Sequence, residues 1–132
     1  MSEEERFRKG AENFRKVYGD VLPMPERMDA DAFTSMTFRN LFGDVWGRDQ
    51  MSMRERRLLI LAAIVSQGAD ASLFEIHAKS ALANREMTHD DLLEVIVTLV
   101  SYVGYPRVSP YYVCAKKLAA AEPGAKSGGP PK

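Results

Sequence analysis

A histidine set among apolar residues is the strongest candidate for chemistry in this sequence. His77 lies in the segment ASLFEIHAKSALA, three or four residues from Leu73, Phe74 and Ala81. These separations place the four side chains on one face of a helix. An imidazole whose pKa stays near 7 suits proton transfer, so His77 is the candidate acid or base. The alternative is a core histidine that is bonded to a carboxylate or to the backbone.

Two arginines, Arg56 and Arg107, are candidates for holding a substrate carboxylate, which the planar guanidinium suits well. Arg54, Arg56 and Arg57 open the apolar helix expected after Ser52, and Arg107 follows the turn Gly104-Tyr105-Pro106. Arg56 has a second interpretation, a salt bridge that fixes the start of the helix. A cation at a helix N-terminus faces the helix dipole and needs an acidic partner.

Other reactive residue types favour structural roles. Cys114, the single cysteine, lies on an apolar face and is expected to be buried and inert. Glu75 lies two residues from His77, so it points to a different side of the helix and is expected to be solvated or at a subunit contact. Trp46 is expected to cover a core edge or an oligomer contact. No spacing of histidines and carboxylates indicates a metal site, and no cofactor-binding motif occurs.

Helix signals along the chain predict an all-α fold of about six helices, with no convincing strand. Ser52 with Glu55, and Thr88 with Asp91, have capping-box spacing, and Gly68 and Gly104 are stop signals. The helix after Ser52 is apolar all round, so it must be buried on nearly every side, partly by neighbouring subunits. The expected helices span 3–18, about 31–42, 52–68, 70–85, 88–104 and 109–121. Residues 122–132, rich in Gly and Pro, are predicted to be a flexible tail after a single domain of residues 1–121.

The composition limits the classes of partner. The chain has 132 residues, with 18 Lys and Arg against 18 Asp and Glu, for a net charge of zero. Nucleic-acid and anionic-membrane surfaces need a positive excess, so neither partner is expected. A near-neutral charge and the tyrosines around Arg107 favour self-association. The single cysteine favours a reducing cytoplasm, and the charged N-terminus has no apolar signal segment.

The order of these motifs resembles the carboxymuconolactone decarboxylase family, in the branch of the alkylhydroperoxidase-D-like proteins that lacks a cysteine pair. The resemblance covers about residues 40–120. It rests on the following run of motifs: Arg56-x-Leu58, an apolar helix ending at Gly68, His77-x-x-x-Ala81-Leu82, Thr88-x-x-Asp91 and Tyr102-x-Gly104-x-Pro106.

The resemblance implies a helical subunit that assembles into a ring-like homotrimer or homohexamer, with active sites near subunit contacts. The enzyme that names the family decarboxylates a γ-lactone acid on the route from protocatechuate to β-ketoadipate, a step of aromatic compound catabolism. It uses no metal and no organic cofactor. By this resemblance the chain is expected to be a carboxy-lyase acting on a small acidic metabolite. His77 matches the family histidine and Arg56 the family arginine, with Arg107 as a second anion holder.

Three departures from the family pattern bear on activity. The cysteine positions of the peroxidase-like branch are Asp70 and Leu73 here, so thiol peroxidase chemistry is excluded. Glu86 stands where the family often has glycine, which alters that turn. The last helix, SPYYVCAKKL, has no histidine where a typical lactone decarboxylase has one. These departures keep a second hypothesis open, that of an oligomeric scaffold or small-molecule binding protein without catalysis.

Overall fold

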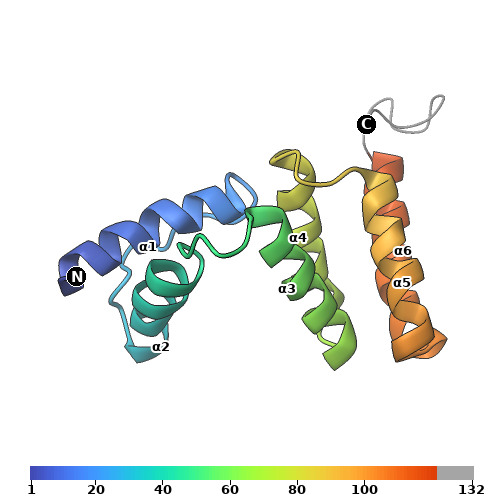
Figure 1. The fold of residues 1–132 in the computed structure, drawn as a ribbon, viewed down its shortest axis with the longest axis horizontal. Helices are drawn as coiled ribbons and strands as arrows, with labels where there is room; N and C mark the ends of the chain where they lie inside the picture. The colour runs from blue at the N-terminus through green and yellow to red at the C-terminus, as the bar shows by residue number, and fades with distance from the viewer. Residues whose placement is uncertain (122–132) are drawn as a thin grey trace. The chain divides into compact units, whose positions relative to one another are not determined.

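The structure, a computed structural model, describes residues 1–121, and every regular element in that range is a helix (Figure 1). This confirms the predicted all-α class with about six helices. The predicted C-terminal tail, residues 122–132, lies outside the described residues. The elements are α1 (Glu3–Tyr18), α2 (Ala32–Met36), the π-helix η1 (Thr37–Val45), α3 (Met53–Gln67), α4 (Ala71–Ala83), α5 (His89–Val103) and α6 (Tyr105–Ala121).

The chain divides into two compact units, one of residues 1–56 and one that begins at Arg57. Helix α3 starts in the first unit, and most of its length belongs to the second. The expectation of one domain over residues 1–121 stays a prediction.

In the first unit, α1 packs closely against η1. A side chain at Gly10 would overlap the backbone carbonyl of Phe38, so glycine is needed at this approach. The rings of Phe14 and Phe42 lie 5.1 Å apart in the small core, and Trp46 stacks on Phe42 at 6.3 Å. Trp46 is 7% exposed, which agrees with its expected place at a core edge.

The second predicted helix is divided in the structure. Asp31 caps it by accepting from the Thr34 amide, but α2 ends at Met36 and η1 follows. The amide of Trp46 donates to the carbonyl of Leu41, five residues back, as in a π-helix. Apolar spacing alone does not distinguish this winding from an α-helix.

The second unit encloses the larger core. Buried side chains from α3, α4, α5 and α6 fill it: Leu61, Val65, Phe74, Ala78, Leu92, Ile96, Val108 and Tyr111. Helices α5 and α6 lie side by side (Figure 1). The capping boxes at Ser52 and Thr88 form as predicted, and Gly68 and Gly104 have the positive φ values of 67° and 103° that favour glycine.

Helix α6 begins at Tyr105, four residues before the predicted start at about Ser109. Gly104 turns the chain directly from α5 into α6, and Pro106 is tolerated because the first turn of a helix needs no amide donors. Pro110 lies inside the helix and lacks an amide hydrogen. The two prolines led to the later predicted start.

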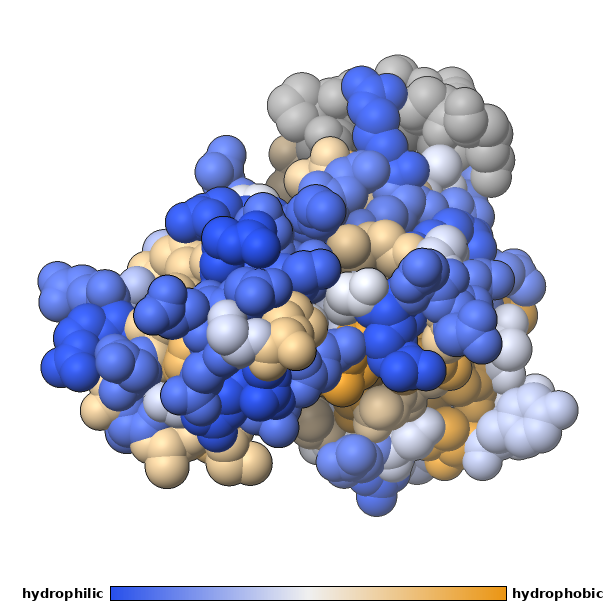
Figure 2. All heavy atoms as spheres, turned by 60° about the vertical axis from the view of Figure 1, so that its left-hand side comes forward, coloured by the Kyte–Doolittle hydropathy of each residue, from blue (hydrophilic) through white to orange (hydrophobic). Residues whose placement is uncertain are grey.

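Within residues 1–121, the buried residues of α3 form one stripe. Within that helix, Arg57, Leu61 and Val65 are buried at four-residue spacing, whereas Leu59 is 55% exposed. Further exposed apolar or aromatic side chains lie on α5 and α6: Val97, Tyr102, Tyr105, Tyr112 and Val113. Figure 2 shows apolar residues reaching the surface beside charged ones. The other described residues therefore leave part of the apolar surface of α3 exposed.

Within residues 1–121, none of the helices has both the length and the apolar content needed to cross a bilayer.

Candidate functional site

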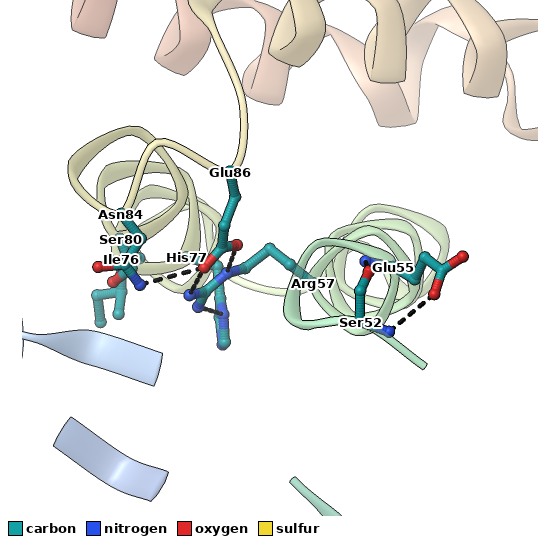
Figure 3. A network of polar contacts seen from close by, with 8 residues as sticks. All are labelled: Ser52, Glu55, Arg57, Ile76, His77, Ser80, Asn84 and Glu86. Atoms are coloured by element: carbon teal, nitrogen blue, oxygen red, sulfur yellow. Dashed lines mark hydrogen bonds and ion pairs between the residues drawn. The ribbon is translucent and has the colours of Figure 1, made fainter. Parts of the chain in front are cut away.

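A buried ion pair joins α3 to the turn between α4 and α5. The Nε and Nη2 atoms of Arg57 donate to the two carboxylate oxygens of Glu86, at 2.9 and 3.0 Å (Figure 3). The Arg57 side chain is fully buried, and that of Glu86 is 8% exposed. Two parallel charge-assisted hydrogen bonds of this kind are strong and directional. They fix the plane of the guanidinium.

His77 completes the site from α4. Its Nδ1 atom lies 3.1 Å from Nη1 of Arg57, and Figure 3 shows the guanidinium between the Glu86 carboxylate and the imidazole ring. Arginine has no acceptor, so Nδ1 of His77 must accept this hydrogen bond. The ring is therefore neutral and carries its hydrogen on Nε2. His77 is 8% exposed.

The helix geometry explains why these side chains meet. Arg57 belongs to the buried stripe of α3, and His77 belongs to the buried face of α4 with Phe74 and Ala81. The predicted face of α4 is confirmed for Phe74, His77 and Ala81, whereas Leu73, predicted on the same face, is 46% exposed. The core that joins α3 and α4 brings the arginine and the histidine together.

The turn after α4 delivers Glu86. Arg85 has a φ of 59°, in the left-handed region, and the amide of Glu86 donates to the carbonyl of Ala81 at 2.9 Å. Met87, 4% exposed, anchors the turn in the core. Asn84 Nδ2 donates to Oε2 of Glu86 at 3.1 Å. Hydrogen bonds from Arg57 Nε, Arg57 Nη2 and Asn84 Nδ2 thus hold the carboxylate in one well-defined position.

The electrostatics keep His77 neutral. Burial is the main cause that lowers the pKa of His77 from 6.5 to about 4, and the Arg57 cation lowers it further. The Glu86 carboxylate acts in the opposite direction and does not offset the other two. The sequence argument assumed a pKa near 7. At pH 7 His77 is therefore a hydrogen-bond donor through Nε2, not an imidazolium acid.

The structure brings Arg57, and not Arg56, to His77. Arg56 is half-buried and donates from Nη2 to the backbone carbonyl of Arg48 at 3.0 Å. Arg107 is exposed and lines a shallow pocket with Gly68, Ala69 and Tyr111. Substrate binding by Arg56 or Arg107 stays a prediction.

The structure agrees with the expected exposure of Glu75, and it leaves Cys114 less buried than predicted. Glu75 pairs with Lys79 at 2.9 Å, with both side chains partly exposed. Cys114 is half-buried, and burial raises the pKa of its thiol, which keeps it protonated and unreactive. Across residues 1–121, no three potential metal-ligating side chains come together.

Sequence reasoning missed Arg57 and Glu86 as members of the site. The available signal for Arg57 was its spacing of four residues from Leu61 and eight from Val65, which places it on the buried stripe. For Glu86, the available signal of burial was its position in a turn, directly before an apolar methionine that the structure buries. Neither signal gives the partner, because the two residues are 29 positions apart.

A comparison with protein families finds a match to the carboxymuconolactone decarboxylase family over residues 31–112, more than half of the chain. The matched range includes Arg57, His77 and Glu86. No curated protein matches the chain.

The low pKa of His77 predicts a loss of stability in mild acid. Between pH 6.5 and about 4 the unfolded chain binds a proton on His77 that the folded protein does not. The free energy of unfolding should therefore fall as the pH drops through this window, by at most about 3 kcal/mol. Urea unfolding at a series of pH values measures this loss. His77→Asn is the control, because it keeps an acceptor near Nδ1 and does not titrate. Equal pH dependence in both proteins would contradict the prediction.

Proposed function

We propose that this protein, which belongs to the carboxymuconolactone decarboxylase family, is an enzyme that removes a carboxyl group from a small acidic lactone or keto acid. The reaction would need no metal or organic cofactor. The observation that supports the proposal most is the neutral His77, held in one tautomer by the Arg57–Glu86 pair. A fixed hydrogen-bond donor in a buried setting suits the stabilisation of an oxyanion.

In the proposed reaction, the bond between the carboxyl carbon and the neighbouring carbon breaks and carbon dioxide leaves. The electron pair moves to the substrate's own carbonyl and forms an enolate. Because Arg57 engages Nδ1, His77 acts through its Nε2 hydrogen, which donates to the enolate oxygen. A proton from water then adds to carbon and completes the product. In this scheme the proton passes from water to carbon, and His77 stabilises the enolate through a hydrogen bond without giving up its own Nε2 proton.

A remaining substrate carboxylate would need a cation, and Arg56 and Arg107 are the proposed holders. Arg107 has the more open position, in the shallow pocket beside Gly68. Arg56 already bonds to the Arg48 carbonyl, and its other donors would meet the substrate.

A second candidate function is a non-catalytic, oligomeric small-molecule binding protein or scaffold. The observation that favours it is the depth of the site, because Arg57 is fully buried and His77 is 8% exposed. A purely structural role, in which the network stabilises the packing of α3 against α4, would also explain why these residues are buried.

Turnover separates the two functions. Wild-type protein is expected to release carbon dioxide from 4-carboxymuconolactone or from a related lactone or keto acid. His77→Asn should reduce kcat by about a hundredfold or more, because it loses the Nε2 donor and keeps the acceptor for Arg57. Circular dichroism and thermal unfolding check that the variant folds. Equal kcat values would remove His77 from the chemistry, and no turnover of any such acid by the wild type would favour the scaffold.

We also propose that the protein self-associates into a homotrimer or homohexamer. The support is the exposed apolar surface of α3, α5 and α6, including Leu59, Val97 and Tyr102. Light scattering at micromolar concentration should give three or six times the subunit mass, and Leu59→Asp with Val97→Asp should lower it. A wild-type monomer at that concentration would contradict the proposal.

A further inference from the structure

We propose that Glu86 determines the charge of the ligand group that lies against His77, by reserving Arg57 for the internal ion pair. The ligand group at His77 is then an uncharged carbonyl, and a ligand carboxylate is not held by Arg57. The inference rests on the proposed function in taking His77 as the group that meets the ligand. It adds to that function a residue that sets specificity.

The occupied edge of Arg57 is the first argument. The two donor atoms that form the carboxylate-binding fork of a guanidinium, Nε and Nη2, both donate to Glu86. The side-on geometry through Nε and Nη2 is therefore taken by Glu86, and the other edge contains Nη1, which contacts His77. Glu86 thus occupies the geometry that makes arginine a good carboxylate receptor.

The charge balance is the second argument. Arg57 and Glu86 cancel, and His77 is neutral, so the buried constellation has no net charge. A carboxylate placed beside it would be an unpaired charge in a poorly solvated position, which is costly. An uncharged carbonyl oxygen has no such cost and accepts the Nε2 hydrogen of His77.

The rigidity of Glu86 is the third argument. Its carboxylate accepts from Arg57 twice and from Asn84 once, and its backbone amide is bonded to Ala81. A ligand must replace several hydrogen bonds to displace it. The pair therefore behaves as a fixed part of the site and not as a counterion that a ligand exchanges.

This arrangement also suits loss of carbon dioxide. A cation bound to the leaving carboxylate would stabilise the charged ground state more than the transition state, in which that charge moves away. Because Glu86 neutralises Arg57, the leaving carboxylate is not stabilised by this cation. Toward the substrate, the role of the Arg57 guanidinium in this proposal is to orient His77.

The test compares the binding of a keto acid with that of its uncharged ester. The probes are levulinate and methyl levulinate, added to wild-type protein and to Glu86→Gln, with the His77 ring nitrogens followed by NMR. Glutamine keeps the shape of the side chain and leaves Arg57 with a net positive charge. Glu75→Gln is the matched control, because it removes a carboxylate from the exposed face of α4.

In the wild type and in Glu75→Gln, any preference for levulinate over the ester should persist when Arg57→Gln is added, because Arg56 or Arg107, and not Arg57, would hold the carboxylate. Glu86→Gln should bind levulinate about tenfold more tightly than the wild type does, and the added Arg57→Gln change should abolish this gain. If Glu86→Gln does not fold, the effect of Arg57→Gln on the wild-type preference between levulinate and its ester still tests the inference. Two results would overturn the inference. One is a preference of the wild type for levulinate that disappears in Arg57→Gln. The other is a folded Glu86→Gln variant that binds levulinate no more tightly than the wild type does. Because binding is measured without turnover, a protein that never decarboxylates an acid can still show the change in levulinate affinity on Glu86→Gln. Failure of the proposed function and failure of this inference can therefore be told apart.

Discussion

The guanidinium of Arg57 is completely buried, and a buried cation has to be neutralised inside the fold. Glu86 supplies the neutralising charge from the turn between α4 and α5, through two hydrogen bonds of 2.9 and 3.0 Å. Removal of one member of a buried pair costs about 3–5 kcal/mol, a large part of the stability of a small domain. The relative positions of α3, α4 and the turn therefore depend on this contact. The hydrogen bond between Arg57 and Nδ1 of His77 depends on it as well.

The same pair defines the chemistry that His77 offers. An arginine beside Nδ1 leaves the imidazole neutral, with its hydrogen on Nε2. A histidine in this state acts on a developing oxyanion as a hydrogen-bond donor, without a preceding protonation step. The chain belongs to the carboxymuconolactone decarboxylase family. We propose that this hydrogen-bond donor acts in a decarboxylation of the kind that names the family.

Local signals allowed most of the fold to be predicted. Caps at Asp70 and Thr88 and stops at Gly68 and Gly104 are contained within a few residues, so the sequence displays them directly. The π-helix η1 and the early start of α6 were missed. The winding of η1 has no distinct residue pattern, and prolines near the start of α6 mimic a loop.

The site was harder to predict than the fold because it depends on contacts between distant residues. Arg56 and Arg57 differ by one position, which is a rotation of about 100° on a helix. That rotation places Arg57 in the core, while Arg56 bonds to the Arg48 carbonyl. Glu86 was interpreted as a change to a turn. Its role became evident only when the core brought the turn against α3, across 29 positions of sequence.

The central claim is that His77 is neutral, because it is buried and lies beside the Arg57 cation, and that its contact with Arg57 keeps the ring hydrogen on Nε2. The most direct measurement is the pair of ¹⁵N chemical shifts and proton couplings of the His77 ring in wild-type protein, recorded from pH 7 down to pH 5. The account predicts an unprotonated Nδ1 and a protonated Nε2 throughout this range, because the pKa of His77 is about 4. A hydrogen on Nδ1 at pH 7, or an imidazolium that forms near pH 6.5, would contradict it.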